Sequence, residues 1–116
     1  MLNDRDTIAD GTLEVRRSRQ GSLCRVSLCG ELDIANTGTA KGALDEVLGD
    51  SVEAIVIDMR ELEFIDSTGI ALLVSILGRE DGGPQLEFVP SESASVARVL
   101  ELTGVSQRLP LASQSS

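Results

Sequence analysis

The residues best suited to chemistry in this sequence are a serine and a threonine in the polar turn at residues 66–69, Asp-Ser-Thr-Gly. The turn follows a short β-branched run at 54–57 (AIVI), which is typical of a strand buried on both faces. Apolar residues then recur at helical spacing: Ile70, Leu73, Val74 and Leu77. A hydroxyl at a helix start can cap the free N–H groups of the first turn, and the same groups can receive a phosphate. The turn therefore predicts either a capped helix start or a phosphorylated switch.

Most catalytic centres are excluded by residue types that the sequence lacks. It contains no histidine, which removes Ser-His-Asp and Cys-His nucleophile systems together with histidine-ligated metals. Neither of the standard glycine-rich phosphate loops is present. We therefore expect a protein that is not an enzyme and that has no cofactor and no metal site.

Three carboxylates could still share one site. Asp33, Asp58 and Asp66 fall near the predicted strand ends, where ligands of α/β folds bind. This placement opens the alternative of a receiver domain that is phosphorylated on Asp58. Such a domain needs an acidic pair after its first parallel strand and a lysine after a late strand. The single lysine, Lys41, lies in the first predicted helix, so the receiver alternative is disfavoured.

Composition and charge narrow the range of partners. The chain has 116 residues, a length that fits one domain, and its net charge is −9. Aromatic residues make up 2% of it, too few for a base-stacking surface, and we expect no direct nucleic-acid partner. No apolar run approaches the roughly 20 residues that span a bilayer, and the polar first ten residues do not resemble a signal peptide. We expect a cytoplasmic protein without a membrane partner.

The two cysteines, Cys24 and Cys29, lie five positions apart on a predicted strand. Successive residues of a strand point to opposite faces, and this spacing separates the two Cα atoms by about 16 Å. A disulfide needs them within about 7 Å. Both are therefore expected to be small buried hydrophobic residues, which agrees with a reducing compartment.

The order of the predicted elements indicates an α/β fold with a mixed sheet. Two strands at 12–19 and 22–28 should form an N-terminal antiparallel hairpin. Strands and helices then alternate: helix 35–48, strand 54–59, helix 67–79, strand 85–90, helix 93–103 and a short last strand at 105–109. We expect one domain at residues 11–110, with flexible tails at 1–10 and 111–116.

The helix that follows the Asp-Ser-Thr-Gly turn is apolar beyond one stripe. Its core face is predicted to carry Leu73 and its helical neighbours, while Leu72 and Ile76 extend the apolar surface around the helix. One interpretation is a helix wedged between the sheet and another helix. The other is a partner surface beside Ser67, because contiguous exposed apolar patches usually mark contacts.

Four segments of the sequence resemble a STAS domain, and more narrowly the stand-alone bacterial anti-sigma factor antagonists. They are Gly30-Glu31-Leu32-Asp33, the strand 54–59, Phe64-Ile65-Asp66-Ser67-Thr68-Gly69 and the segment 99–105 (VLELTGV). The resemblance covers residues 12–110, and two of its motifs, GELD and F-x-D-S-T-G, stand in the order and at the spacing of the family. The third helix departs from the family in Ala94, where many members have proline.

The resemblance implies a phosphorylation switch. Such proteins bind an anti-sigma factor that is itself a serine kinase, and thereby release a sigma factor. The kinase phosphorylates the first hydroxyl of the turn, here Ser67, and a phosphatase restores it. The expected partner surface comprises Asp33, Asp66, Ser67, Thr68, Gly69, Leu72 and Ile76. The alternative function is that of a STAS-like regulatory or accessory subunit of a transport or stress-signalling complex.

Overall fold

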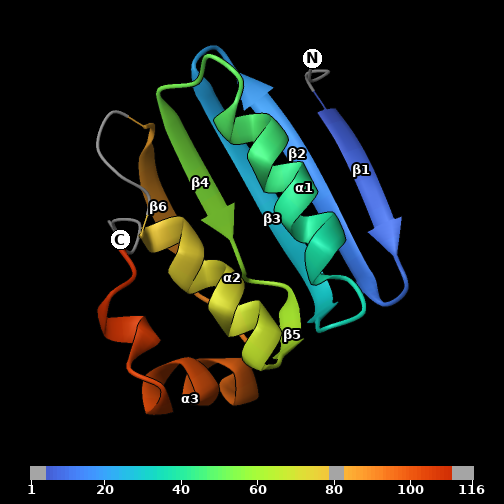
Figure 1. Cartoon of the computed structure of the whole chain (residues 1–116), viewed down its shortest axis with the longest axis vertical. Helices are drawn as coiled ribbons and strands as arrows, with labels where there is room; N and C mark the ends of the chain where they lie inside the picture. Colours follow the sequence, from blue (N-terminus) through green and yellow to red (C-terminus); the bar gives the residue numbers. More distant parts are fainter. Residues whose placement is uncertain (1–4, 79–82, 111–116) are drawn as a thin grey trace.

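The computed structural model describes residues 5–78 and 83–110, which form one mixed sheet with helices packed on it (Figure 1). The strands are β1 (Arg5–Asp10), β2 (Leu13–Gln20), β3 (Leu23–Leu32), β4 (Ala54–Asp58), β5 (Leu62–Ile65) and β6 (Gln85–Val89). The helices are α1 (Thr37–Leu48), α2 (Ser67–Leu77) and α3 (Ala94–Leu102), followed by a 3-10 turn, Val105–Gln107. The predicted α/β class with a mixed sheet is confirmed.

The sheet begins antiparallel and continues parallel. Its order is β1-β2-β3-β4-β6, and β5 pairs with the far end of β3. The pairs β1–β2 and β2–β3 are antiparallel, whereas β3–β4, β3–β5 and β4–β6 are parallel. The predicted hairpin of β2 and β3 is confirmed. Because β4 and β5 both pair parallel to β3, their carboxyl ends, and the loop that leads into α2, lie at one edge of the sheet.

The core lies between the sheet and the pair α1 and α2, which Figure 1 shows side by side on one face. Side chains that alternate along the strands are buried there, such as Val26 and Leu28 of β3 and Ile57 of β4. The other face of β2 and β3 carries exposed Arg16 and Arg25. The strand alternation also puts Cys24 and Cys29 on opposite faces, both as free, buried thiols, as predicted. Burial raises the pKa of both thiols.

The expectation of a loose tail at residues 1–10 is wrong for residues 5–10, which form β1, while residues 1–4 lie outside the described residues. Because this segment is mostly polar, its composition did not indicate that it pairs with β2 as a strand. Asp6 accepts hydrogen bonds from the guanidinium of Arg17 (2.7 Å from Nε to Oδ1), and Asp10 accepts one of 2.6 Å from the hydroxyl of Thr39. Arg17 is buried and also donates to the carbonyl of Ala43 in α1 (3.1 Å). The inward carboxylates are thus satisfied by groups distant in the sequence.

Two further expectations about elements need correction. The four-residue strand β5 was not predicted, because a strand this short has little periodicity to detect. The expected strand at 105–109 is instead a 3-10 turn at Val105–Gln107, which follows Gly104 with its positive φ of 77°. The helix predicted at 67–79 ends at Leu77, and the expected C-terminal tail at 111–116 lies outside the described residues.

Gly30 lets β3 change its partner strand. Its φ is 97°, and an added Cβ would overlap the carbonyl oxygen of Thr12. The register of β3 shifts between Gly30 and Glu31, as β3 passes from pairing with β4 to pairing with β5. The glycine of the GELD motif therefore places the end of β3 beside the start of α2.

Candidate functional site

The start of α2 is capped by Asp66, the residue before the two hydroxyls. Its Oδ1 accepts hydrogen bonds from the backbone N–H of Thr68 (2.9 Å) and of Gly69 (3.1 Å), and from the Thr68 hydroxyl (2.6 Å). Its Oδ2 accepts one from the backbone N–H of Ile34 (3.1 Å). The hydrogen bond from the Thr68 side chain, followed by those from the three backbone amides, lowers the pKa of Asp66 below its ordinary value. Asp66 therefore stays ionised and holds the turn.

Ser67 is the first residue of α2 and is exposed. The expectation that a hydroxyl caps this helix is corrected, because the Asp66 carboxylate takes that role. The Ser67 hydroxyl has no hydrogen-bond partner among the described residues, whereas the hydroxyl of Thr68 is held by Asp66. The two adjacent hydroxyls thus differ: one is open to another molecule and the other is part of the turn.

The GELD loop lies against the same turn and presents an exposed isoleucine. Asp33 accepts a 3.0 Å hydrogen bond from the N–H of Ala35, and its own N–H donates to Oδ1 of the buried Asn36 (3.0 Å). The Asn36 amide also donates to the carbonyl of Glu31 (2.9 Å). Between these anchors, the side chain of Ile34 is 76% exposed. Its position directly after the motif was the available signal, but sequence analysis did not select Ile34 or Asn36.

Gly69 is required by packing. A Cβ at this position would lie 2.6 Å from Cγ1 of Ile65 and 3.0 Å from Cγ of Leu32. The backbone of α2 therefore approaches the ends of β3 and β5 more closely than a larger residue allows. The structure brings Asp33, Asp66, Ser67, Thr68 and Gly69 together at this edge of the sheet.

Leu72 and Ile76, expected on the partner surface, are buried, with exposed fractions of 7% and 5%. They line a small space of about 170 Å³ between α1 and α2, opposite Leu44 and Leu48. The wedged-helix interpretation is therefore the correct one. Because α2 is apolar almost all round, its sequence did not indicate which side meets α1.

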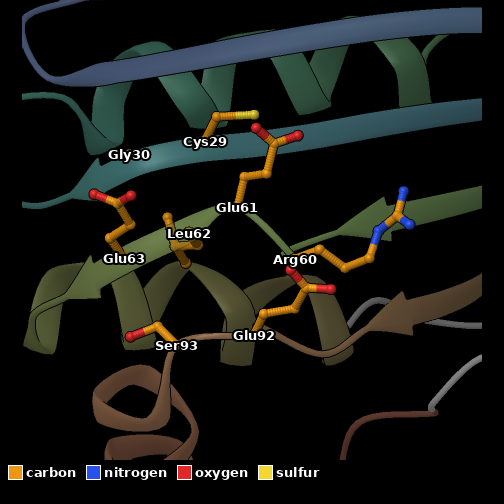
Figure 2. Close-up of a pocket in the computed structure, with 8 residues that line it drawn as sticks. All are labelled: Cys29, Gly30, Arg60, Glu61, Leu62, Glu63, Glu92 and Ser93. Atoms are coloured by element: carbon orange, nitrogen blue, oxygen red, sulfur yellow. The ribbon is translucent and has the colours of Figure 1, made fainter.

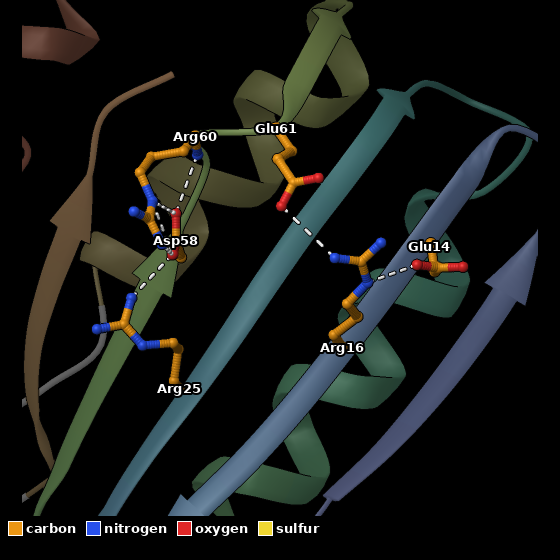
Figure 3. Close-up of polar contacts among 6 residues, drawn as sticks. All are labelled: Glu14, Arg16, Arg25, Asp58, Arg60 and Glu61. Carbon is orange, nitrogen blue, oxygen red and sulfur yellow. Dashed lines mark hydrogen bonds and ion pairs between the residues drawn. The ribbon is translucent and has the colours of Figure 1, made fainter. Parts of the chain in front are cut away.

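Asp58 does not join Asp33 and Asp66. It is the last residue of β4, is buried and lies on the face of the sheet away from α1 (Figure 3). The guanidinium groups of Arg25 and Arg60 each donate to its Oδ2 at 2.8 Å. Burial opposes ionisation, but the hydrogen bonds and charge of Arg60, with Arg25, hold the pKa of Asp58 below its ordinary value. The expectation of one site shared by three carboxylates is therefore wrong.

A hollow near this edge (Figure 2) has none of residues 66–69 in its lining. It has a volume of about 410 Å³, and three of its lining residues are the glutamates Glu61, Glu63 and Glu92. Within residues 5–78 and 83–110, no group of three histidine, cysteine, aspartate or glutamate side chains is placed to hold a metal ion. Over the same residues, no helix has the length and apolarity needed to cross a bilayer.

Residues 15–111 match the sequence profile of a protein family described as "Mlab, STAS domain". The match spans most of the chain, and the chain belongs to this STAS-domain family.

Two curated relatives carry related names. The chain is 26% identical over 104 residues to the anti-sigma-F factor antagonist RsfB of Mycobacterium tuberculosis, covering 89% of this chain and 84% of RsfB. It is 24% identical over 93 residues to the anti-sigma-B factor antagonist of Staphylococcus aureus, covering 80% of this chain and 86% of that protein. Both are named as regulators rather than enzymes, which agrees with the prediction that the chain is not an enzyme.

Solved structures of antagonists share the fold. An anti-sigma factor antagonist from Mycobacterium paratuberculosis superposes with a TM-score of 0.78 at 24% identity, over 92% of this chain and 91% of that one. Unphosphorylated SpoIIAA superposes with a TM-score of 0.66 at 18% identity, over 86% of this chain and 89% of that one. Phosphorylated Bacillus SpoIIAA superposes with a TM-score of 0.52 at 17% identity, over 86% of this chain and 92% of that one.

Proposed function

We propose that this protein is an anti-sigma factor antagonist that binds an anti-sigma factor with serine kinase activity, and that phosphorylation of Ser67 ends the binding. A phosphatase acting on phospho-Ser67 restores it. The observation that carries the proposal is the exposed Ser67 hydroxyl, which is without a hydrogen-bond partner in the described part of the chain, beside a Thr68 hydroxyl that Asp66 holds. The names of the relatives and the existence of SpoIIAA in a phosphorylated form support it.

The arrangement of the turn lets a phosphate change the surface without unfolding the domain. Among the described residues, the Ser67 hydroxyl makes no hydrogen bond that the modification would break, and the cap of α2 belongs to Asp66. A phosphate adds about 1.5 to 2 negative charges. The first-turn N–H groups of Thr68 and Gly69 already bind Asp66, so they are not free to neutralise that charge. The new charge therefore adds to an anionic neighbour at the surface.

The partner surface that we propose is centred on Ser67 and Ile34. Both are exposed, and the hydrogen bond from Ile34 N–H to Asp66 fixes their loops relative to each other. Asp33 and Thr68 border this surface, whereas Gly69 supports it from beneath. A partner patch that packs on the apolar Ile34 side chain and a neutral hydroxyl is dehydrated on binding. A phosphate placed there meets desolvation and repulsion from Asp66, and the complex dissociates.

Binding of the purified protein to the anti-sigma factor kinase tests the proposal. Ser67→Ala should bind like the wild type in the presence of ATP, where the wild type is released as phosphate accumulates on Ser67. Ser67→Asp should bind at least about tenfold more weakly, equivalent to about 1.4 kcal/mol. Thr68→Ser is the matched control, because it keeps the hydroxyl that Asp66 holds. Phosphopeptide mapping that places the phosphate on Thr68 or Ser93, with unchanged binding of Ser67→Asp, would contradict the assignment.

The alternative function is that of a STAS-like subunit of a transport or stress-signalling complex. A subunit of a transport complex would not need a phosphorylatable serine. Recovery of transporter subunits with the protein, and equal recovery with Ser67→Asp, would favour that alternative. In that case no kinase-dependent release should be observed with ATP.

A further inference from the structure

Two hollows of opposite charge lie on the face of the sheet that is turned away from α1 and α2. The first, called the basic hollow, has a volume of about 400 Å³. The exposed residues Arg5, Arg16 and Arg25 line it, together with the ion pair of Arg17 and Asp6. The second, the acidic hollow, has a volume of about 410 Å³, and its charged lining residues are Glu61, Glu63 and Glu92 with one arginine, Arg60, which is bound to Asp58. Two patches of opposite charge on one face can be complementary to a partner surface with the reverse arrangement.

Strand register builds the basic hollow. Ser18 of β2 is paired with Arg5 of β1 on one side and with Arg25 of β3 on the other. Two residues before Ser18 in β2, Arg16 is paired with Thr7 of β1 and with Ser27 of β3. Directly paired residues project from the same face, so three arginines surround the serine hydroxyls in a triangle. β1, which the sequence analysis took for a tail, supplies one of the three.

The two hollows share one face because β3 runs past both. Arg25 and Ser27 line the basic hollow, and Cys29, two residues further on, lines the acidic one. Side chains two residues apart on a strand point to the same side, about 7 Å apart. Figure 3 shows Arg16, Arg25 and Glu61 on this side, with the helices behind the sheet.

The arginines keep donors for a partner. Arg16 binds Glu14 through Nε and approaches Glu61 at 3.5 Å, while its side chain remains 50% exposed. Arg25 binds Asp58 through one terminal nitrogen and remains 46% exposed. A guanidinium has five N–H donors, so each can bind a further carboxylate. The acidic hollow offers such carboxylates, and Glu63 and Glu92 form no ion pair among the described residues.

We propose that a second copy of this chain binds this face, with the basic hollow of each copy over the acidic hollow of the other. Charge complementarity argues for this occupant. Suppose that the two sheets face each other and that a twofold axis runs between them, perpendicular to the line joining the two hollows. The basic hollow of each copy then faces the acidic hollow of the other. The same contact then forms twice. α2 and its Ser67 turn lie on the opposite face, so the dimer leaves the proposed kinase site open.

Charge exchange tests the dimer. Arg5→Glu/Arg16→Glu reverses the basic hollow, and Glu63→Arg/Glu92→Arg reverses the acidic hollow. Sedimentation equilibrium should show that each variant alone dimerises at least about tenfold more weakly than the wild type. An equimolar mixture of the two variants should regain wild-type association, because both pairs of hollows are again complementary. Circular dichroism checks that each variant is folded.

The second variant separates specific pairing from general repulsion. Each Glu→Arg change adds two positive charges, so Glu63→Arg/Glu92→Arg moves the net charge from −9 to −5. General repulsion would fall, and only the loss of a specific contact predicts weaker association. Arg98→Glu and Glu101→Arg, exposed on α3, are the matched controls and should leave dimerisation unchanged. A wild type that stays monomeric at about millimolar concentration, or a mixture that does not associate, would overturn the proposal.

Failure of the dimer is distinguishable from failure of the proposed function. Kinase-dependent release of the wild type and its absence in Ser67→Ala depend on the α2 turn and the GELD loop beside it. The charge-exchange variants change the other face of the sheet and should keep both behaviours.

Discussion

The backbone N–H of Ile34 donates a 3.1 Å hydrogen bond to Oδ2 of Asp66, and so joins two loops that are 32 residues apart in the sequence. The other oxygen of the same carboxylate caps α2. One side chain therefore sets both the start of the helix that carries Ser67 and the position of the exposed Ile34. The GELD loop and the Asp-Ser-Thr-Gly turn are therefore joined through one carboxylate.

Asp66→Ala should loosen both loops, because it removes the acceptor of three backbone N–H groups. The Ile34 amide should exchange with deuterium faster than in the wild type, and the denaturant midpoint should fall. Ser67→Ala is the control, and its free energy of unfolding should stay within about 0.5 kcal/mol of the wild type. Equal protection of the Ile34 amide in wild type and Asp66→Ala would show that the bond does not hold the loop.

Ile34→Ala should weaken binding to the anti-sigma factor while leaving the fold intact. The side chain is 76% exposed, so truncation should change the free energy of unfolding by less than about 0.5 kcal/mol. An apolar anchor at the centre of an interface typically contributes more than about 1 kcal/mol, and we expect about tenfold weaker binding by calorimetry.

Leu102→Ala is the matched control for Ile34. Leu102 is 72% exposed but lies near the end of α3. Its truncation should change neither stability nor binding. If both variants lost affinity equally, the partner surface would have to extend over α3 and would not be centred on the Ser67 turn.

Sequence patterns were sufficient for the elements whose signals are local. The β-branched run of β4 and the start of α2 at Ser67 were predicted from adjacent residues alone, and both are observed. The end of α3 beside Gly104 also followed from one residue type, and its positive φ agrees.

Contacts between distant residues account for the errors. The sequence places Asp6 in a solvated tail, whereas in the structure it forms an ion pair with Arg17. Only the two hydroxyls were considered as possible caps of α2, although Asp66 stands one position earlier and also accepts a hydrogen bond from Ile34. The choice between Leu72 as a surface or a core residue depended on where α1 packs. None of these three facts is encoded in local periodicity.

Gly69→Ala and Gly42→Ala should have opposite effects on stability. At Gly69 the new methyl group would lie 2.6 Å from Ile65, and overpacking of this kind costs about 1 to 3 kcal/mol. At Gly42, inside α1, a Cβ meets nothing within 4 Å, and alanine is preferred over glycine in a helix by about 1 kcal/mol. Urea unfolding of both variants measures the two changes. A stabilised Gly69→Ala would mean that the approach of α2 to β5 is looser than described.

Asp58→Asn should reduce the pH dependence of stability in the acid range. The charge and hydrogen bonds of Arg60 and Arg25 hold the pKa of Asp58 below the ordinary value, although burial opposes them. As the pH falls below about 4, the unfolded chain takes up a proton at this carboxyl before the folded chain does. The stabilisation from Asp58 is thus complete above that pH and is lost as the pH falls through the folded-state pKa.

Urea unfolding at about pH 6 and about pH 3 measures this contribution, because the drop in free energy of unfolding between the two should be smaller in Asp58→Asn than in the wild type. The variant should also be less stable at pH 6, since Arg25 and Arg60 lose their shared carboxylate. Asp45→Asn is the control: Asp45 forms an exposed pair with Lys41 in α1, and such pairs contribute little. If Asp58→Asn kept the full wild-type drop while Asp45→Asn reduced it, the acid sensitivity would come from α1 and not from the arginine-bound carboxylate at the end of β4.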